Sequence, residues 1–252
     1  MKILFSPSEG KRFGGRKDSG LDISTLLFAR DSDIRERVLE RYAEILSSGD
    51  MKLLSSLFGI RSREDIARYA SIDPFSSPVM KALYRYDGVS YDYLDSSTLD
   101  SDAISYLEEN MIIFSNLFGP LRASDEIPFY RMKQGSTLDG LKTEKLYKEA
   151  FSKLLDELLQ NEDILDLRAA FYDRFYKASG SFTTLRFIKG GKVVSHWAKA
   201  YRGIVARACA QNGIESMEEF LSMPIEGLRV LEISEKSLKR EIVYEIDPNF
   251  SR

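Results

Sequence analysis

The feature that most constrains the fold is a pair of short apolar runs that lie far apart in the chain. One is "KILF" at residues 2–5 and the other is "MIIFSNLF" at 111–118. Both are bounded by turn-forming or polar residues, as buried strands usually are. Further strand-rich segments are expected at 163–176, 183–198 and 225–246. Because helical patterns separate these segments and no repeat is visible, the sequence predicts an α+β fold with a mixed sheet flanked by helices.

Apolar residues at three- and four-residue spacings predict the helices. The longest predicted helices cover 21–46, 142–161 and 198–211, the last of them ended by Asn212-Gly213. Two short helices in 49–74 are joined at Gly59, with Ser62 as the N-cap of the second. Another short helix in 78–95 is expected to end at Gly88, and Lys189–Lys192 is typical of a hairpin turn. No linker or change of composition divides the chain, so one compact domain over 1–252 is predicted.

Composition excludes several classes of protein. Of the 252 residues, 43% are hydrophobic and 30% are charged, which is typical of a soluble globular protein. A single cysteine, Cys209, excludes an internal disulfide and a Cys-rich zinc site, and a single histidine, His196, makes His-based catalysis improbable. No secretory signal or membrane-spanning apolar stretch is visible. We therefore expect a cytoplasmic protein with no membrane partner, no metal and no other cofactor.

Charge is strongly segregated along the chain. Residues 168–207 contain nine basic residues and one acidic residue, whereas residues 208–252 contain nine acidic residues and five basic ones. A basic segment in a protein of net charge −3 indicates a surface for a polyanion. The alternative is that these cations lie on solvated strand faces or pair with acids elsewhere.

Three segments could hold an anion. "FGPLRASDEIPFYRMKQG" at 118–135 combines cations, prolines and aromatic residues in one loop. "AKAYRG" at 198–203 carries Gly203, whose place inside a helix suggests close approach of another backbone or a ligand. The helix pair at 51–70 could be a helix-hairpin-helix element that presents backbone N–H groups, Arg61 and Arg63 to a phosphate. A plain pair of helices that packs apolar side chains into the core is the alternative.

Four motifs in order resemble the YaaA family of bacterial peroxide-stress proteins. They are "ILFSPSEGK" (3–11), "YDGVSYDYL" (86–94), "SNLFGPLRASDEIPFYRMKQG" (115–135) and "AKAYRG" (198–203) followed by Arg207. The resemblance implies an unusual α+β topology with a positively charged cleft and a helix-hairpin-helix-like element. It also implies DNA binding and a role in surviving hydroperoxide. The chain departs from the family at Ala169 and Phe171, where other members carry a Ser-x-Glu-Tyr pattern.

Three functional hypotheses follow. The leading one is sequence-independent binding of duplex or branched DNA, with Tyr130 or Trp197 stacking on bases. Seven cations would line one cleft and contact phosphates: Lys11, Arg122, Arg131, Lys133, Lys199, Arg202 and Arg207. Three residues would orient the site: Ser6, Asp125 and Tyr130.

The second hypothesis is an enzyme acting on a nucleotide or nucleobase, with Arg122 and Arg131 clamping a phosphate and Asp125 or Lys199 as acid-base groups. The third is an Arg–Asp network that only fixes the loop.

Overall fold

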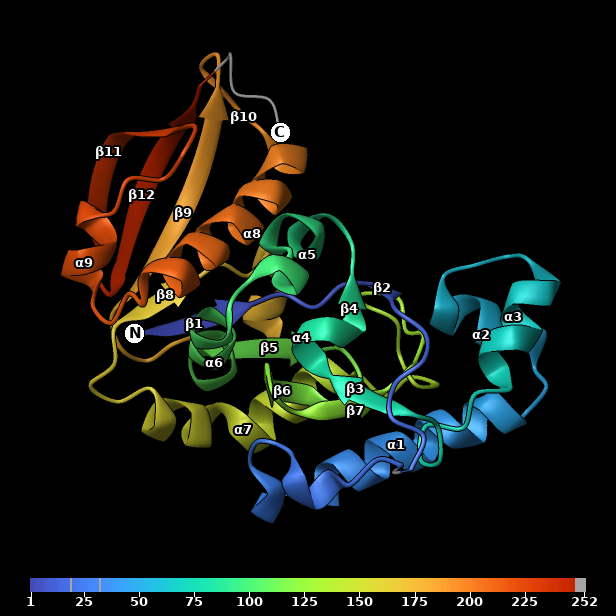
Figure 1. Ribbon diagram of the computed structural model, residues 1–252. Helices are drawn as coiled ribbons and strands as arrows, with labels where there is room; N and C mark the ends of the chain where they lie inside the picture. Colours follow the sequence, from blue (N-terminus) through green and yellow to red (C-terminus); the bar gives the residue numbers. More distant parts are fainter. Residues whose placement is uncertain (19, 32, 248–252) are drawn as a thin grey trace.

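A mixed sheet that joins strands from both ends of the chain forms the centre of the fold (Figure 1). The computed structural model describes residues 1–18, 20–31 and 33–247, except for the side chains of Asp31, Ser195 and His196. In these residues the main sheet has eight strands in the order β11-β12-β9-β8-β1-β5-β6, with β10 beside β9. The strands are β1 (Lys2–Phe5), β5 (Met111–Ser115), β6 (Gly119–Arg122), β8 (Ile164–Asp166), β9 (Phe182–Lys189), β10 (Lys192–Val193), β11 (Leu228–Lys236) and β12 (Lys239–Ile246).

The middle of this sheet is parallel. β1 lies between β5 and β8 and runs parallel to both, with Ile3 opposite Met111 on one side and Leu165 on the other. β9 is parallel to β8 and to β12, whereas the edge strands β6 and β11 are antiparallel to their neighbours. The carboxyl ends of β1, β5 and β8 therefore meet at one edge of the sheet, which is where open parallel sheets usually hold their sites.

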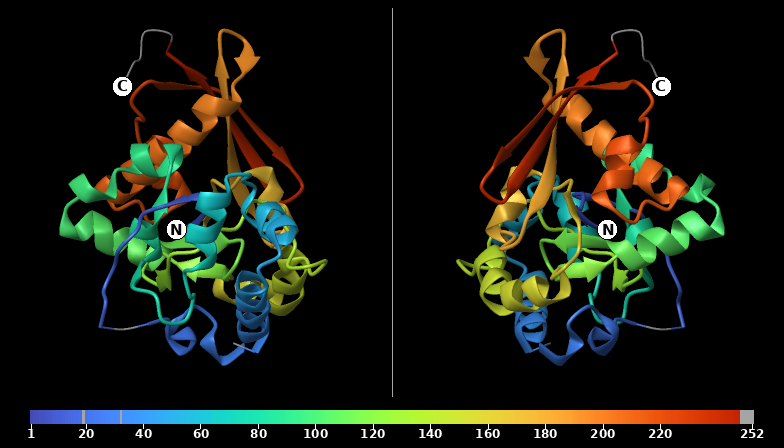
Figure 2. Two further views of the ribbon diagram at one scale, coloured as in Figure 1. Left: turned by 90° about the vertical axis from the view of Figure 1, so that its right-hand side faces the viewer. Right: turned by 90° about the vertical axis from the view of Figure 1, so that its left-hand side faces the viewer.

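Helices cover both faces of the sheet, with α5, α6 and α8 on one side and α7 on the other (Figure 2). The α-helices are α1 (Asp33–Ser47), α2 (Met51–Phe58), α3 (Arg63–Ala70), α4 (Ala82–Arg85), α5 (Val89–Leu94), α6 (Ser101–Asn110), α7 (Thr143–Leu158), α8 (Ser195–Asn212) and α9 (Met217–Ser222). The 3-10 helices are η1 (Ile23–Thr25), η2 (Ala29–Asp31), η3 (Ser96–Thr98) and η4 (Ala170–Arg174). Two small sheets pair β2 (Gly10–Lys11) with β4 (Tyr86–Asp87) and β3 (Val79–Lys81) with β7 (Glu126–Pro128).

α8 packs tightly against α5 because Gly203 has no side chain. A Cβ atom at this position would lie 2.1 Å from the carbonyl oxygen of Ser90. The Ser90 hydroxyl donates a hydrogen bond to the carbonyl of Lys199 at 2.9 Å, and Arg207 donates to the carbonyls of Leu94 and Asp95 at the end of α5. The close backbone approach expected at Gly203 is confirmed, and its partner is α5.

The α+β fold and the mixed sheet flanked by helices are confirmed, and the chain forms a single compact domain. Two helix predictions were wrong. The helix expected over 21–46 begins only at Asp33, because the Asp22 side chain accepts a hydrogen bond from the N–H of Ser24 and starts a 3-10 turn instead. Gly88 does not end a helix but precedes α5, after the short α4 and β4. None of the described helices combines the length and apolarity needed to cross a bilayer.

Candidate functional site

A buried lysine lies beside the carboxyl ends of β1 and β5. Lys11 is only 8% exposed, and its Nζ atom donates hydrogen bonds to the carbonyls of Ser8 (2.9 Å) and Glu9 (3.4 Å). Pairing of β2 with β4 sets Lys11 opposite Tyr86, and Nζ lies 4.0 Å from the centre of the Tyr130 ring. The ammonium is thus surrounded by carbonyl oxygens and aromatic faces.

This environment changes the chemistry available to Lys11. Burial lowers the pKa of its amine to about 7, and the nearby Arg131 guanidinium acts in the same direction while Glu9 opposes it. An amine that is partly uncharged at neutral pH can accept a proton or attack an electrophile. The same burial makes Lys11 less suited to contacting a phosphate of a large polyanion.

Hydroxyl groups form a network behind the lysine. The Tyr130 hydroxyl lies 3.0 Å from that of Tyr86 and 2.9 Å from the Ser115 hydroxyl. Ser115 in turn accepts hydrogen bonds from the N–H groups of Leu117 and Phe118. Burial raises the pKa of Tyr130 well above its usual value, so the phenol stays protonated. At 2% exposure the Tyr130 ring cannot stack on a base, so this half of the stacking prediction was wrong, and stacking by Trp197 stays a prediction.

Arg131 connects the lysine centre to the helical hairpin formed by α2 and α3. Its guanidinium donates hydrogen bonds to the carbonyl of Glu9 at 3.1 Å and to the carbonyl of Phe58, the last residue of α2, at 3.2 Å. The carboxylate of Glu9 lies 3.5 Å from the same guanidinium and accepts a hydrogen bond from the N–H of Gln134. Ser6 has a similar connecting role, because its hydroxyl accepts a hydrogen bond from the N–H of Ala169, just before η4.

Arg122 and Asp125 lie apart from this centre and anchor a loop. The buried carboxylate of Asp125 accepts hydrogen bonds from the N–H of Leu27, from the N–H of Arg122 and from Nε of Arg122, all at 2.8–2.9 Å. Arg122 also donates to the carbonyl of Thr25. These contacts favour the hypothesis of a structural network for this pair.

The hairpin of α2 and α3 has an apolar inner side and a cationic outer side. Gly59 ends α2 in the left-handed region, with φ of 68°, and Ser62 caps α3 by accepting a hydrogen bond from the N–H of Asp65. Leu54, Leu57, Phe58 and Ile66 are buried. Four exposed cations lie on the hairpin, three of them at the turn and Lys52 at the other end of α2. Within the described residues their side chains form no hydrogen bond or ion pair: Lys52, Arg61, Arg63 and Lys133. We call these four residues the hairpin cations.

The three cations predicted from "AKAYRG" and Arg207 lie along α8, which is separated from the hairpin in Figure 1. Lys199 is exposed, Arg202 lines a separate pocket and Arg207 holds the end of α5. Of the seven predicted cations, the structure therefore places Lys11, Arg131 and Lys133 on the hairpin side, three on α8, and Arg122 in the loop network with Asp125. Tyr86 and Ser115 were missed, although both stand inside motifs that the sequence singled out.

The fold and these sites define an α+β protein with a buried lysine centre beside a cationic helical hairpin. By sequence, the chain belongs to the family of the peroxide stress protein YaaA, whose family model matches residues 1–233. It is 44% identical to an uncharacterized protein of Campylobacter jejuni over 98% of this chain and 99% of that protein. It is 34% identical to a UPF0246 protein of Corynebacterium efficiens (86% of this chain, 87% of that protein) and 32% identical to one of Streptomyces coelicolor (84% of each).

Proposed function

We propose that this protein binds the phosphate backbone of duplex or branched DNA, without sequence preference, as part of the response to hydroperoxide. The observation that carries the proposal is the set of hairpin cations on α2, on the turn between α2 and α3, and on the adjacent loop. The side chains of these cations have no partner in the described part of the chain, so their charge is available to an anion. The peroxide-stress part of the proposal comes from the family to which the chain belongs.

The backbone of the turn adds to this charge. Among the described residues, the N–H groups of Ile60, Arg61 and Ser62 donate no hydrogen bond, and they precede the first turn of α3. Free N–H groups at the start of a helix favour an anion, because the helix dipole is positive there. Lys133 lies across the turn: a Cβ on Gly59 would be 2.6 Å from its Cδ atom.

An exposed aromatic residue lies next to the hairpin. Phe13 is 54% exposed and stacks on Phe129 with ring centres 4.1 Å apart, while Tyr69 of α3 stacks on the same pair. The Arg68 guanidinium lies 5.6 Å from the centre of the Phe13 ring. Aromatic faces beside cations bind unpaired bases by stacking, worth about 1–3 kcal/mol per base. This arrangement favours DNA with unpaired bases, as at a branch, over fully paired duplex.

The proposal can be tested by fluorescence anisotropy with labelled duplex, branched and single-stranded DNA over a range of salt concentrations. If the hairpin cations neutralise about four phosphates, log K should fall with log salt with a slope of about −3 to −4. The double variant Arg61→Gln/Arg63→Gln should weaken binding to all three DNA forms and reduce this slope by about 2. Lys148→Gln, which removes one exposed charge from α7, is the control and should bind as the wild type does. Equal affinity and equal slope for the wild type and the double variant would contradict the proposal.

A second candidate function, an enzyme acting on a nucleotide or nucleobase, is supported by Lys11. Its buried amine, with a pKa of about 7, is suited to general-base or nucleophilic chemistry. The experiment is incubation of the protein with nucleotides and nucleobases, followed by chromatography. Turnover by the wild type that is lost in Lys11→Met and Lys11→Arg would support the enzyme, and turnover that survives both substitutions would exclude Lys11 as the catalytic residue.

A further inference from the structure

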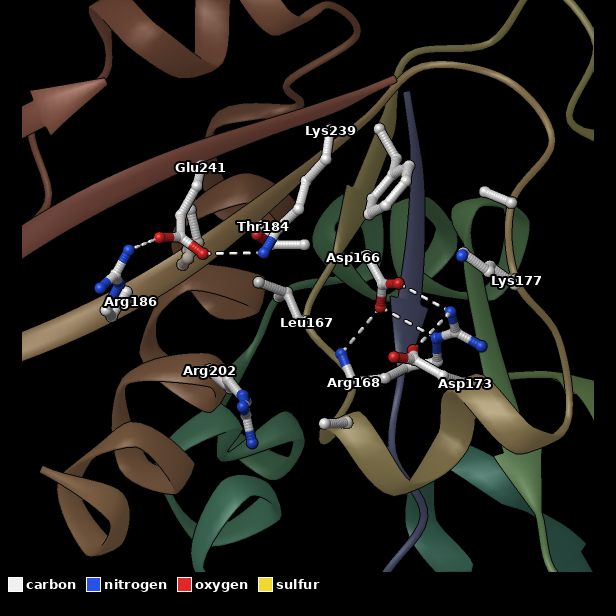
Figure 3. A pocket seen from close by; sticks show the side chains of 14 residues that line it. Asp166, Leu167, Arg168, Asp173, Lys177, Thr184, Arg186, Arg202, Lys239 and Glu241 are labelled. Carbon is white, nitrogen blue, oxygen red and sulfur yellow. Dashed lines mark hydrogen bonds and ion pairs between the residues drawn. The ribbon is translucent and has the colours of Figure 1, made fainter. Parts of the chain in front are cut away.

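A second pocket, remote in sequence from the hairpin, lies at the carboxyl end of β8 (Figure 3). Its volume is about 350 Å³, and it is lined by β8, β9, η4, α8 and the beginning of β12. Leu167, Phe182 and Leu185 form its apolar wall. Sites for small molecules commonly have volumes of about 300–1,000 Å³ and combine an apolar wall with a few polar groups.

Two of the three acidic residues that line the pocket, Asp166 and Glu241, form close ion pairs. Asp166 forms a two-pronged ion pair with Arg168, at 2.9 Å and 2.7 Å, and both residues are buried. Arg168 also lies 3.8 Å from Asp173. On the opposite side, Glu241 pairs with Arg186 and with Lys239. Figure 3 shows these as two separate groups of dashed contacts. Asp166 and Glu241 are therefore paired at close range, whereas the exposed carboxylate of Asp173 has only the longer contact to Arg168.

Two cations of the pocket remain without such a pair. Within the described residues, neither Arg202 nor Lys177 forms a hydrogen bond or ion pair. Arg202 is partly buried, and burial lowers the pKa of its guanidinium although the more distant Asp166 opposes the shift. A third polar group is also unsatisfied: the Thr184 hydroxyl is buried and has no hydrogen-bond partner. Lys177 is exposed, whereas Arg202 is partly buried and the Thr184 hydroxyl is buried. Burying a guanidinium and a hydroxyl without partners is costly, which argues that an anion is their partner.

We propose that this pocket binds a phosphate monoester, with Arg202 donating two hydrogen bonds to the phosphate, Lys177 supplying a second charge and Thr184 donating from its hydroxyl. A guanidinium matches the geometry of phosphate oxygens, and the apolar wall suits the sugar or base that carries the phosphate. The phosphate could belong to a free nucleotide or to the 5′ end of a DNA strand. This inference goes beyond the proposed function because the hairpin cations take no part in it.

Isothermal titration calorimetry with thymidine 5′-monophosphate tests the inference, and thymidine is the control ligand. The monophosphate should bind, and thymidine should bind at least about tenfold more weakly, since hydrogen bonds to charged groups contribute about 1.5–3 kcal/mol. Binding should tighten as the pH rises from 5 to 7, because the second proton of a phosphate monoester is lost near pH 6. Equal binding of thymidine and its monophosphate would overturn the proposal.

Variants locate the binding in the pocket. Arg202→Met should weaken monophosphate binding at least about tenfold. Lys177→Met, an exposed substitution that should not disturb folding, should also weaken it. Lys192→Met removes an exposed cation of the same basic segment outside the pocket and should leave binding unchanged. Wild-type affinity in both pocket variants would overturn the proposal.

A last comparison distinguishes the two sources of phosphate. Oligonucleotides with and without a 5′-phosphate are titrated into the wild type and into Arg61→Gln/Arg63→Gln. If the double variant still binds the phosphorylated strand more tightly than the unphosphorylated one, the ligand is a strand end. If the mononucleotide binds more tightly than the phosphorylated strand, the ligand is a free nucleotide. Both results support the pocket, and neither depends on DNA binding by the hairpin.

Discussion

The Nζ atom of Lys11 lies 4.0 Å from the centre of the Tyr130 ring, so the amine faces an aromatic surface where most lysines face water. The ring attracts the charged form, but burial disfavours that form more strongly and lowers the pKa to about 7. Folding therefore makes this amine easier to deprotonate than it is in the unfolded chain.

This shift predicts how stability depends on pH. Between the folded pKa of about 7 and the unfolded value of 10.5, the unfolded chain binds more protons at Lys11 than the folded protein does. The contribution of Lys11 to the free energy of unfolding should therefore rise from pH 7 to pH 10, by up to about 4 kcal/mol at about 1.4 kcal/mol per pH unit. Urea unfolding of the wild type and of Lys11→Met across this range checks it. A difference between the two proteins that does not change with pH would contradict the prediction.

Gly203→Ala should destabilise the protein although alanine favours helices. The new methyl group would lie 2.1 Å from the Ser90 carbonyl, and relieving that overlap forces α8 away from α5 at a cost of about 1–3 kcal/mol. Gly180→Ala is the matched control, because a Cβ there meets no atom within 4 Å. Chemical denaturation measures both. Equal effects at the two glycines would mean that the contact between α5 and α8 does not limit stability.

The contributions of Asp166 and Arg168 to the free energy of unfolding should depend on each other. Asp166→Asn leaves a guanidinium that is 7% exposed without its carboxylate, and breaking a buried pair in this way costs about 3–5 kcal/mol. The double variant Asp166→Leu/Arg168→Met should lose less free energy of unfolding than the two single substitutions together. Purely additive losses in urea unfolding would show that the two charges do not depend on each other.

Cys209 should be inert to peroxide in the folded protein. Its side chain is completely buried in α8, and burial raises the pKa of its thiol far above the usual range, so almost no thiolate forms. We expect no labelling by a thiol reagent and no oxidation by hydrogen peroxide, as followed by mass spectrometry, until the protein is unfolded in guanidinium. Rapid labelling of the folded protein would indicate instead that Cys209 can sense peroxide.

Local rules predicted the elements whose signals lie within a few residues. Gly213 ends α8 in the left-handed region, Lys189 pairs with Lys192 across the predicted turn, and Ser62 caps α3. The pairing of Arg122 with Asp125 also follows from their spacing of three residues. Each of these features depends on neighbours in sequence.

The sites depend on neighbours in space, and sequence spacing does not reveal them. Lys11 is buried because Tyr86 and Tyr130 are brought to it by the pairing of β2 with β4 and by the hydroxyl network. Arg202 and Thr184 meet in one pocket only because α8 packs beside β9. The cations of the basic segment also differ in their surroundings: Arg186 pairs with Glu241 from the acidic segment, whereas Arg202 has no such pair within the described residues. Net charge along the sequence could not separate these cases.

The position of β1 between β5 and β8 governs when the sheet can be assembled on the ribosome. Residues 2–5 have no partner strand in this sheet until residues 111–115 have been made, and no second partner until residues 164–166 have been made. During synthesis, which proceeds at about 5–20 residues per second, this apolar strand must therefore wait for many seconds. The centre of the sheet cannot close before β8 emerges, so the pocket beside β8, which also needs Lys239 and Glu241, is completed late, when most of the chain already exists.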